Sequence, residues 1–521
     1  MKKSIILSLV ILLMATACQD YNLLVKNPNL PTSASPSLLL TGVLNRMNDE
    51  NAWDGIQGSQ GAAQFWIGNY TYYGTNNYDQ APFTNSNFYY LTLQNVVQME
   101  GEAVKAGGAS VNPYTAMGKF FRAYYFNLMM QKYGDLPVTK SLLGVESTTP
   151  AYDTQKVGYT QVLKWLEDSN AEFAQLITAG DVSLSGDPFL GNDLRKWQKV
   201  VNSFTLRVLI SLSKKDTDPD LGIKQKFANI VTNQTKYPVM TSLGDNLQYV
   251  YNVQFNNYPK NPGTRGFDIA RENVASTYLG LTTSLKDPRT FIAATPAPAQ
   301  LDAGKLYTDY AAYVGANAGD DMGKLGVDAQ AGKYSFVNAL RYYSTYDGSA
   351  AEPAIIIGYP ELCFNIAEGI NRGWATGNSA AWYTNGIKAS FAHLGITEGG
   401  SIQVGDKLST VYGSVTTSIN TYLAQPAVSY QGDNATGLNQ ILTQKYIAFW
   451  QNSNWEAFFN WRRTGVPTMQ VGAGTGNGGK IPLRWQYPFT ERTANQANYQ
   501  SSIQSQYSGN DDLNGVMWIL K

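Results

Sequence analysis

The stretch NPYTAMGKFFRAYYFNLMMQKYGDLP, residues 112–137, decides the fold class. Asn112 is a favourable helix N-cap, and Pro113 suits the first helical position, where its missing N–H costs nothing. Gly134 and Pro137 are typical of residues that end a helix. Between these ends, apolar residues recur at helical spacing in two stripes: Met117, Phe120, Phe121, Tyr124 and Leu128 form one, and Phe126, Met129 and Met130 form the other. A helix that is apolar on two sides packs between neighbours, so this stretch predicts the central helix of a helical stack.

Further amphipathic segments on both sides of this helix extend the stack. They lie at 38–47, 86–106, 155–178, 193–214, 360–395, 404–424, 437–452 and 453–467. Residues 360–395 form a predicted helical hairpin whose length and pattern resemble a tetratricopeptide unit. In the last segment, Ser453 and Glu456 suit a capping box, and Arg462 and Arg463 suit the final turn. We therefore predict a mainly α-helical chain built on a tetratricopeptide-like scaffold of helical pairs.

Two stretches lack a sustained helical or strand period. Residues 58–83 crowd aromatic side chains among Gly and Asn, and we interpret most of this stretch as a loop. Residues 236–350 are rich in Gly, Pro, Asn and Tyr, with one expected helix at 268–285. We interpret them as a long irregular insertion, and irregular segments of this size usually carry function.

The composition narrows the choice of partners. The chain has 521 residues, of which 12% are aromatic and 15% charged, with 39 basic and 39 acidic residues. Without residues 1–17, which contain Lys2 and Lys3 and no acid, 37 basic residues face 39 acidic ones, a net charge of −2. Such a chain has no excess of positive charge for a nucleic acid. His393 is the one histidine, which excludes a site with several histidine ligands.

The N-terminus predicts export and anchoring. Lys2 and Lys3 precede an apolar run at 5–14 that is too short to remain as a membrane span. The following Ala-Thr-Ala-Cys at 15–18 resembles a bacterial lipobox, so residues 1–17 are expected to be a signal peptide and Cys18 the lipidated residue; simple secretion after cleavage at 17 is the alternative. Residues 18–36 would be a lipidated tether, and residues 37–521 a single α-helical domain. With Cys18 acylated, Cys363 has no partner, and no intrachain disulfide is expected.

Two sequence matches to phosphate-binding and calcium-binding motifs lack residues that those motifs require. The glycines at 474–479 fit GxGxxG, but Ile481 and Pro482 follow where a helix is needed, so a flexible glycine loop is predicted. Three aspartates at 216, 218 and 220 imitate the start of a calcium loop. The turn glycine is replaced by Leu221 and the bidentate glutamate by Phe227.

No catalytic residue, cofactor or metal is predicted. The pairs at 320–321 and 511–512 are adjacent aspartates, and adjacency does not place two acids across a sugar as glycoside hydrolysis requires. Cys363 lies among apolar residues of a predicted helix, which favours a buried, inert thiol. His393, at a helix end, is interpreted as a capping or packing residue.

Several short motifs stand in a recognisable order. They are YGDLP at 133–137, Trp197 with Leu206-Arg207, DPR at 287–289, Glu361-Leu362 with Ala367-Glu368, EAF at 456–458 with WRRTG at 461–465, and Arg484 with Tyr487-Pro488 and Glu491, all behind Cys18. In this order the chain resembles the SusD/RagB family over essentially its whole length. The resemblance implies a surface lipoprotein of tetratricopeptide-like helix pairs whose irregular loops form the ligand face. Such proteins cap a TonB-dependent, SusC-like outer-membrane transporter and hand it glycans or, in some members, peptides.

Candidate ligand residues come from two aromatic segments. A sugar has an apolar C–H face and a polar edge, so its site needs aromatic faces beside amide and carboxylate groups. Residues 65–79 and 307–321 supply this mixture, and we expect them to meet over the scaffold. The candidates are Trp66, Asn69, Tyr72, Tyr73, Tyr78, Tyr310 and Tyr313.

The leading functional hypothesis is capture and delivery of a nutrient oligomer, most simply an oligosaccharide, without catalysis. A peptide is the alternative ligand, because aromatic, Asn-rich loops suit peptide backbones too. A helical scaffold that binds only protein is the third hypothesis.

Overall fold

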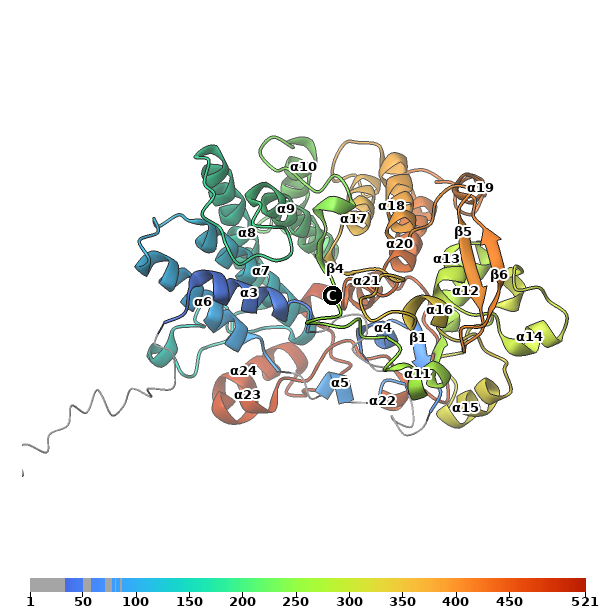
Figure 1. Cartoon of the computed structure of the whole chain (residues 1–521). Coiled ribbons are helices and arrows are strands. Elements are labelled where there is room, and N and C mark those ends of the chain that lie inside the picture. The colour runs from blue at the N-terminus through green and yellow to red at the C-terminus, as the bar shows by residue number, and fades with distance from the viewer. Residues whose placement is uncertain (1–32, 50–57, 71–76, 80, 85–86) are drawn as a thin grey trace, which may run out of the picture.

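The computed structural model describes residues 33–49, 58–70, 77–79, 81–84 and 87–521. Long helices form an arc across the upper part of the molecule, and short elements and turns fill the lower and right-hand parts (Figure 1). Cys18, Tyr72 and Tyr73 lie outside the described residues, as do the expected signal peptide and most of the tether. Within the described part, none of the helices combines the length and hydrophobicity of a membrane span.

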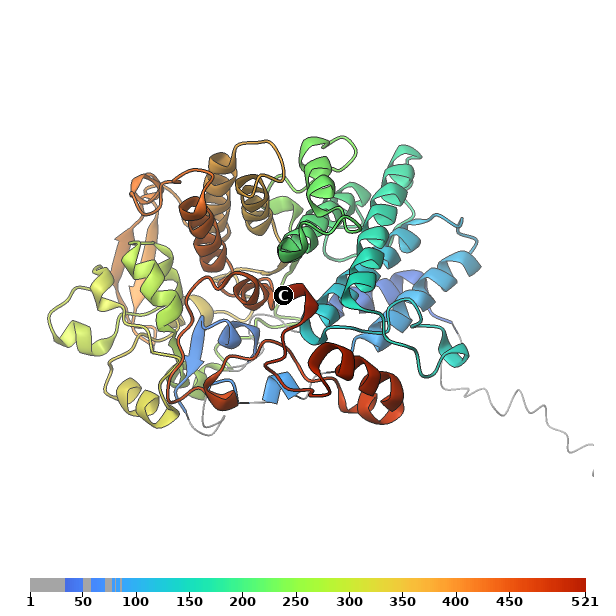
Figure 2. The ribbon, with the colours of Figure 1, turned by 180° about the vertical axis from the view of Figure 1, so that it is seen from behind.

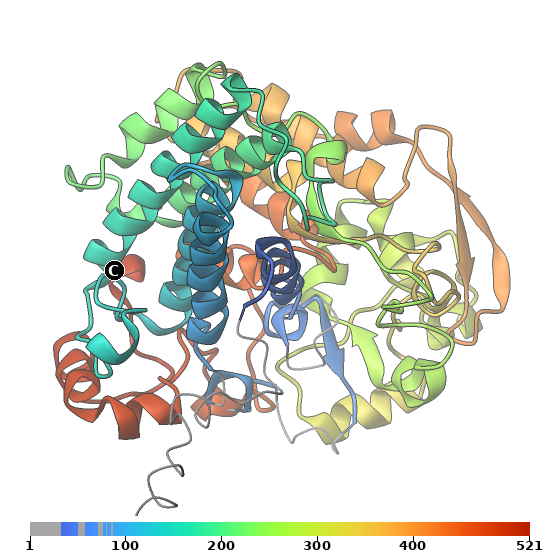
Figure 3. The ribbon, with the colours of Figure 1, turned by 60° about the vertical axis from the view of Figure 1, so that its left-hand side comes forward.

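The arc consists of paired helices. Neighbours in the chain pack on each other, α6 on α7, α7 on α8, α8 on α9 and α17 on α18, and α9 contacts α17 to join the two groups. The N-terminal α3 packs along α6, as Figure 3 shows. This arrangement confirms the predicted mainly α, tetratricopeptide-like scaffold. The bounds are α3 (Pro36–Arg46), α6 (Tyr90–Lys105), α7 (Pro113–Tyr133), α8 (Gln155–Thr178), α9 (Leu194–Ser211), α10 (Ile223–Thr232), α17 (Tyr359–Asn371), α18 (Ser379–His393) and α20 (Ala435–Ala448).

The helix α7 is central, as its two apolar stripes predict. Asn112 Oδ1 accepts a hydrogen bond from the Thr115 N–H (3.2 Å), and Thr115 Oγ1 accepts one from the Asn112 N–H (3.0 Å), which completes a capping box. Phe120 is fully buried, with its ring centroid 5.6 Å from that of Trp197 in α9. Gly134 ends the helix at φ +106°, a backbone conformation that glycine adopts without steric cost.

Buried ion pairs join helices that are distant in sequence. Arg207 Nε of α9 donates to Glu361 Oε1 of α17 at 2.8 Å. Arg463 Nη2 donates to Glu368 Oε2 of α17 at 2.9 Å. All four residues are buried and belong to the motifs that carry the family resemblance. Those motifs therefore have a structural role, because removing one partner of a buried pair costs about 3–5 kcal/mol.

Short elements make up the rest of the chain, and within the described residues the named strands form antiparallel pairs: β1 with β3, β2 with β4, and β5 with β6. The bounds of the first group are α4 (Ser59–Ala62), β1 (Trp66–Gly68), α5 (Ala81–Thr84), β2 (Leu247–Tyr249), α11 (Arg265–Arg271), β3 (Glu272–Val274), α12 (Ser276–Ser284), α13 (Arg289–Ala293), α14 (Pro298–Asp302), α15 (Met322–Gln330), α16 (Ala339–Tyr342) and β4 (Ala354–Ile357). The second group comprises β5 (Ser401–Gly405), β6 (Val411–Thr416), α19 (Ile419–Ala424), α21 (Glu456–Thr464), α22 (Gly476–Gly479), α23 (Phe489–Ala494) and α24 (Gln496–Tyr507). Single 3₁₀ turns are η2 (Gly144–Glu146), η3 (Ser213–Lys215), η4 (Leu243–Asp245), η5 (Tyr310–Ala312) and η6 (Trp518–Leu520).

Two packing features tie the short elements to the scaffold. A small second core lies beneath the β1–β3 pair and joins it to α15, with Ile67, Ala275, Ala316, Met322, Leu325 and Phe336 among its members. The C-terminus returns to the middle of the molecule (Figure 2), where Lys214 Nζ donates to the Leu520 carbonyl oxygen at 2.7 Å. The last residues thus close over the helical arc.

The predicted helix at 404–424 is wrong in its first part. Residues 401–416 form the β5–β6 hairpin, which stands at the edge of the molecule in Figures 1 and 3, and only the end of the segment is helical, in α19. Asp406 Oδ1 accepts hydrogen bonds from the N–H groups of Leu408 (2.8 Å) and Thr410 (2.7 Å), which stabilises the turn. Val411 and Tyr412 are residue types that favour strands.

One other prediction fails because β1 pairs with β3. Residues 58–83, predicted to be mostly loop, contain only the short elements α4, β1 and the start of α5 in their described part. The helix predicted at 268–285 is divided into α11 and α12 by β3, in which Val274 lies opposite Trp66. The insertion at 236–350 as a whole carries the short elements β2, β3 and α11–α16.

The capping box predicted from Ser453 and Glu456 does not form. Helix α21 begins at Glu456, directly after Trp455, and Ser453 has φ +61°. The Ser453 N–H donates to the Ile355 carbonyl oxygen of β4 at 2.7 Å, and its Oγ donates to Asn452 Oδ1 at 2.8 Å. A tertiary contact therefore fixes this turn in place of a local cap.

Candidate functional site

Trp66, one of the predicted ligand residues, belongs to the core. Its side chain is 0% exposed, and Lys260 Nζ lies 4.9 Å from its ring centroid. Lys260 forms ion pairs with Glu272 and, at 3.2 Å, with Asp268, while Tyr343 OH donates to Glu272 at 2.9 Å. Burial raises the pKa of Glu272 to about 7 against the lowering effect of Lys260. The ring is thus one wall of a buried charged cluster and presents no face to a ligand.

Asn69 and Tyr78 are also buried, and the protein itself uses their polar groups. Asn69 Nδ2 donates to Asn273 Oδ1 at 2.6 Å. Tyr78 OH donates to the Ala62 carbonyl oxygen and accepts from Gln64 Nε2, both at 2.9 Å. Their hydrogen bonds hold the ends of the 65–79 segment against the scaffold, which is a positioning role.

Tyr310 and Tyr313 pack on α13, away from the Trp66 cluster. Tyr313 is 4% exposed, its ring centroid lies 5.1 Å from that of Phe291, and its OH donates to the Tyr307 carbonyl oxygen at 2.8 Å. Tyr310 is half-buried, 4.9 Å from the same phenylalanine ring. These two tyrosines therefore anchor the second segment to the scaffold.

The two predicted segments do meet, through backbone and amide groups. Asn77 Nδ2 donates to the Ala318 carbonyl oxygen at 2.7 Å, and the Gly474 N–H donates to the Gly319 carbonyl oxygen at 2.8 Å. A Cβ on Gly474 would lie 1.9 Å from the Asp320 carbonyl oxygen. The glycine run at 474–479 is thus a wedge between both segments, where a flexible loop was predicted, and its glycines allow the close backbone approach.

An exposed aromatic group in the 65–79 segment was not among the predicted site residues. Tyr70 lies two residues after the end of β1 and is 42% exposed, with the Arg271 guanidinium carbon 4.0 Å from its ring centroid. Asp268, on the same helix as Arg271, keeps 37% of its side chain exposed. A partly exposed ring beside a cation and a carboxylate suits a ligand with apolar and polar faces. The available signal was its place within the aromatic-rich segment 65–79. We define Tyr70, Asp268 and Arg271 as the loop face.

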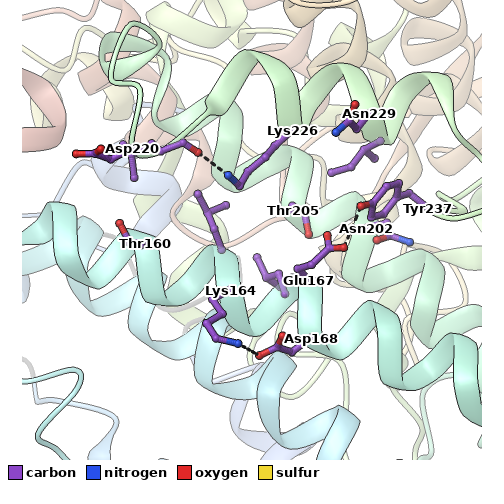
Figure 4. Close-up of a pocket in the computed structure, with 14 residues that line it drawn as sticks. Thr160, Lys164, Glu167, Asp168, Asn202, Thr205, Asp220, Lys226, Asn229 and Tyr237 are labelled. Atoms are coloured by element: carbon purple, nitrogen blue, oxygen red, sulfur yellow. Dashed lines mark hydrogen bonds and ion pairs between the residues drawn. The ribbon is translucent and has the colours of Figure 1, made fainter.

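A separate groove of about 340 Å³ lies between α8 and α10 with α9 behind it (Figure 4). Its apolar walls include Leu163, Leu166, Leu221 and Ile230. On the rim, Lys164 Nζ pairs with Asp168 Oδ2 at 2.6 Å, and Tyr237 OH donates to Glu167 Oε1 at 2.9 Å. Because these charged groups are already paired over an apolar floor, the groove is a poor site for a sugar.

The groups that could have carried chemistry have other roles. Burial raises the pKa of the Cys363 thiol to about 12, so it is unreactive at neutral pH. Asp320 pairs with Lys324 at 2.6 Å, and Asp321 Oδ1 accepts the Lys324 N–H at 2.9 Å as the cap of α15. Among the described residues, no group of three or more His, Cys, Asp or Glu side chains is arranged to hold a metal ion.

Comparisons with known proteins identify the fold and family. A family model described as "Starch-binding associating with outer membrane" matches residues 28–488. A SusD homologue from Bacteroides fragilis aligns with a TM-score of 0.81 at 28% identity, covering 94% of this chain and 100% of that one. A Bacteroides vulgatus protein, described as an outer-membrane protein with a role in nutrient binding, aligns with a TM-score of 0.78 at 29% identity over the same shares.

A more distant structure has the same fold. It is a chitin-binding SusD homologue from Flavobacterium johnsoniae, with a TM-score of 0.68 at 18% identity, covering 93% of this chain and 98% of that one. No curated protein sequence matches the chain. The family model spans most of the chain, and the solved homologues align with 93–94% of it. The chain therefore belongs to the SusD-like family of outer-membrane-associated binding proteins.

Proposed function

We propose that this protein captures an oligosaccharide at the cell surface and delivers it to a TonB-dependent, SusC-like transporter of the outer membrane. The observation that carries the proposal is membership of a family whose description names starch binding and the outer membrane. A relative of the same fold is described as chitin-binding. Starch is a polymer of glucose and chitin a polymer of N-acetylglucosamine, which makes a carbohydrate the first ligand class to test.

The loop face is our proposed first contact with the glycan. Tyr70 offers a partly exposed ring, and Asp268 and Arg271 offer an acceptor and donors beside it. A sugar ring stacks its C–H face on an aromatic ring while its hydroxyl groups bind the charged edge. Tyr72 and Tyr73 follow closely in sequence, and their assignment as ligand residues rests on that sequence. The buried candidates position this segment.

Calorimetric titration tests this function. Maltohexaose, chitohexaose and a mixture of random hexapeptides are titrated separately into the purified protein. Tyr70→Ala is expected to weaken glycan binding about 2- to 10-fold, the equivalent of about 0.5–1.5 kcal/mol for an aromatic contact. Phe489→Ala is the matched control, because Phe489 is an aromatic residue with 73% exposure on the distant α23.

Each result has a defined meaning. Binding of hexapeptides with no heat from either glycan would replace the carbohydrate with the peptide alternative. If no ligand binds and only a protein partner is retained, the scaffold hypothesis holds instead. Glycan binding that is unchanged in Tyr70→Ala would refute the loop face as the contact surface.

The anchor at Cys18 has its own test. We propose lipidation there because small residues precede the cysteine after a short apolar run. Mass spectrometry of the native mature N-terminus should find acyl chains on Cys18, and Cys18→Ala should release the protein from membranes, since acyl chains supply the binding energy. A native protein with an unmodified Cys18 would refute the anchor.

A further inference from the structure

A polar pocket lies on the far side of α16 from the Trp66 cluster. It has a volume of about 440 Å³ and opens between α16, the C-terminal end of α18, and β5, in the right-hand half of Figure 1. Ligand pockets of proteins have volumes of about 300–1,000 Å³, so this one can hold a small ligand or one unit of a larger one. Neither the predicted site residues nor the loop face contribute to its lining.

The two sides of α16 separate this pocket from the loop face. Tyr343, directly after the helix, donates its OH to Glu272 in the Trp66 cluster. Arg341, two residues earlier, turns the other way, and its Nη2 donates to the Leu394 carbonyl oxygen at the end of α18 at 3.0 Å. A ligand in the pocket would therefore contact groups that a ligand at the loop face does not reach.

His393 lines the pocket and carries an unpaired polar atom beneath its wall. Its Nε2 is buried and has no hydrogen-bond partner among the described residues. Burial lowers the pKa of the imidazole to about 4, with Arg341 acting in the same direction and Glu352 against it. The ring is therefore neutral at pH 7. A buried polar atom without a partner costs about 1–3 kcal/mol. Because His393 lines the pocket, its ring also reports on any ligand that binds there.

The pocket has no net charge to offer a ligand. Arg341 is the one charged residue of its lining, and Arg341 Nε donates to Glu352 Oε2 at 2.8 Å. Glu352 is buried and also accepts a hydrogen bond from Tyr342 OH at 2.9 Å, so the positive charge is balanced inside the protein. An anion gains little here, and a cation finds no carboxylate in the lining. Arg341 Nη1, which no described residue accepts, remains as a donor.

The rim and walls complete a surface with both donors and acceptors. Gln403 and Ser401 of β5 line the opening, and no described residue binds their side chains. Ile292 and Leu340 supply apolar walls below them. Amide, imidazole and guanidinium groups above aliphatic walls match the hydroxyl groups and C–H faces of a sugar ring.

We propose that this pocket binds one unit of a neutral glycan, as a second carbohydrate site distinct from the loop face. The proposal rests on the proposed function and deepens it, because it assigns a neutral sugar to a particular set of groups. A glycan held at both sites gains avidity that neither site has alone.

The single histidine makes the test direct. Protein without a polyhistidine tag and labelled at the histidine ring carbon Cε1 gives one imidazole signal, which belongs to His393. Maltotriose and triacetylchitotriose are the probes, and inorganic phosphate and a neutral tripeptide are the comparisons. A glycan probe is expected to shift the His393 signal in a saturable way, with the same dissociation constant as calorimetry reports for this site. Phosphate and the tripeptide should leave it unchanged.

Two variants locate the site. Ala350→Trp places a large side chain in the pocket lining and should abolish the shift. Gln403→Ala, at an exposed strand position, should weaken binding about 2- to 10-fold, the range for one hydrogen bond of about 0.5–1.5 kcal/mol. Tyr70→Ala should leave the His393 shift in place, since it alters the other site. Circular dichroism checks that each variant is folded.

The outcomes separate this inference from the function on which it rests. Glycan binding by calorimetry without any change at His393, and without an effect of Gln403→Ala, overturns the second site and leaves the proposed function standing. A shift caused by phosphate or the tripeptide but by neither glycan overturns the sugar assignment. Loss of the His393 shift in a folded Tyr70→Ala protein overturns the separation of the two sites. Absence of both heat and shift with every glycan refutes both proposals.

Discussion

Truncating Trp66 should destabilise the protein strongly, in contrast to what its sequence context suggests. Trp66→Ala removes a side chain that is 0% exposed and packs between β3 and the Lys260 cluster. Large aromatic truncations in cores cost about 3–5 kcal/mol. The Lys260 ammonium, 4.9 Å from the ring centroid, loses a desolvated cation–π contact of about 2 kcal/mol, which places the expected loss near the upper end of that range. Domains are typically stable by only about 5–15 kcal/mol, so the effect is large.

Urea unfolding followed by circular dichroism measures this loss. Trp66→Ala should move the midpoint to lower urea without a change in slope, and glycan affinity should stay unchanged in the protein that remains folded. Phe489→Ala, at 73% exposure, is the control and should cost less than about 0.5 kcal/mol. A loss below about 1 kcal/mol for Trp66→Ala, together with weakened glycan binding, would refute the core assignment, since buried aromatic truncations cost several times as much.

Three further predictions follow from burial, close packing and charge. Phe121→Ala in α7 should lower the free energy of unfolding by about 3–5 kcal/mol in the same assay, because Phe121 is 0% exposed. A loss of less than about 1 kcal/mol would show that α7 is not central. Gly474→Ala should lower the free energy of unfolding by about 1–3 kcal/mol, since its Cβ would lie 1.9 Å from a carbonyl oxygen. The control Gly280→Ala in α12 meets no atom within 4 Å and should be neutral or stabilising. Equal effects of the two substitutions would contradict the close packing of the 474–479 run between the two segments. The pKa of His393 should be about 4 by NMR titration, below the value of about 6.5 in an unfolded chain. Because the folded pKa is the lower one, the unfolded chain takes up the proton first as the pH falls below 6.5. Acidification from pH 6.5 towards 4 should therefore lower the free energy of unfolding by on the order of 3 kcal/mol. A measured pKa of about 6 or more would show that the ring is solvated.

The helical half of the molecule was predictable because its signals are local. The segment predicted at 155–178 coincides with α8 (Gln155–Thr178), and the cap at Asn112 forms as its sequence indicates. Each depends on side chains within a few turns of one another. In the other half, β1 has three residues and is defined by its pairing with β3, about two hundred positions away. No period in residues 58–83 could indicate a partner at that distance.

The candidate site shows the same division between local and distant causes. Crowded aromatic residues were assigned to a ligand because they lie outside the periodic segments. Trp66 and Tyr313 are buried by contacts with Lys260 and Phe291, which no local pattern contains. Tyr70, in contrast, stays exposed at the end of β1. Exposure, the property that a ligand contact needs, was the one property that the sequence pattern could not supply.

The motifs that identify the family are also the groups that hold its scaffold together. Arg207 binds Glu361, Arg463 binds Glu368, and Tyr487 OH donates to the Asp135 carbonyl oxygen at 2.7 Å. Their order along the chain therefore reflects which parts of the scaffold contact each other, and it carries no information about the ligand. The loop face and the pocket beside His393 lie outside these motifs and are supported by short elements on that scaffold. A substitution in either surface can change the ligand without breaking a buried ion pair, so the scaffold can keep one architecture while its binding surfaces adapt to different glycans.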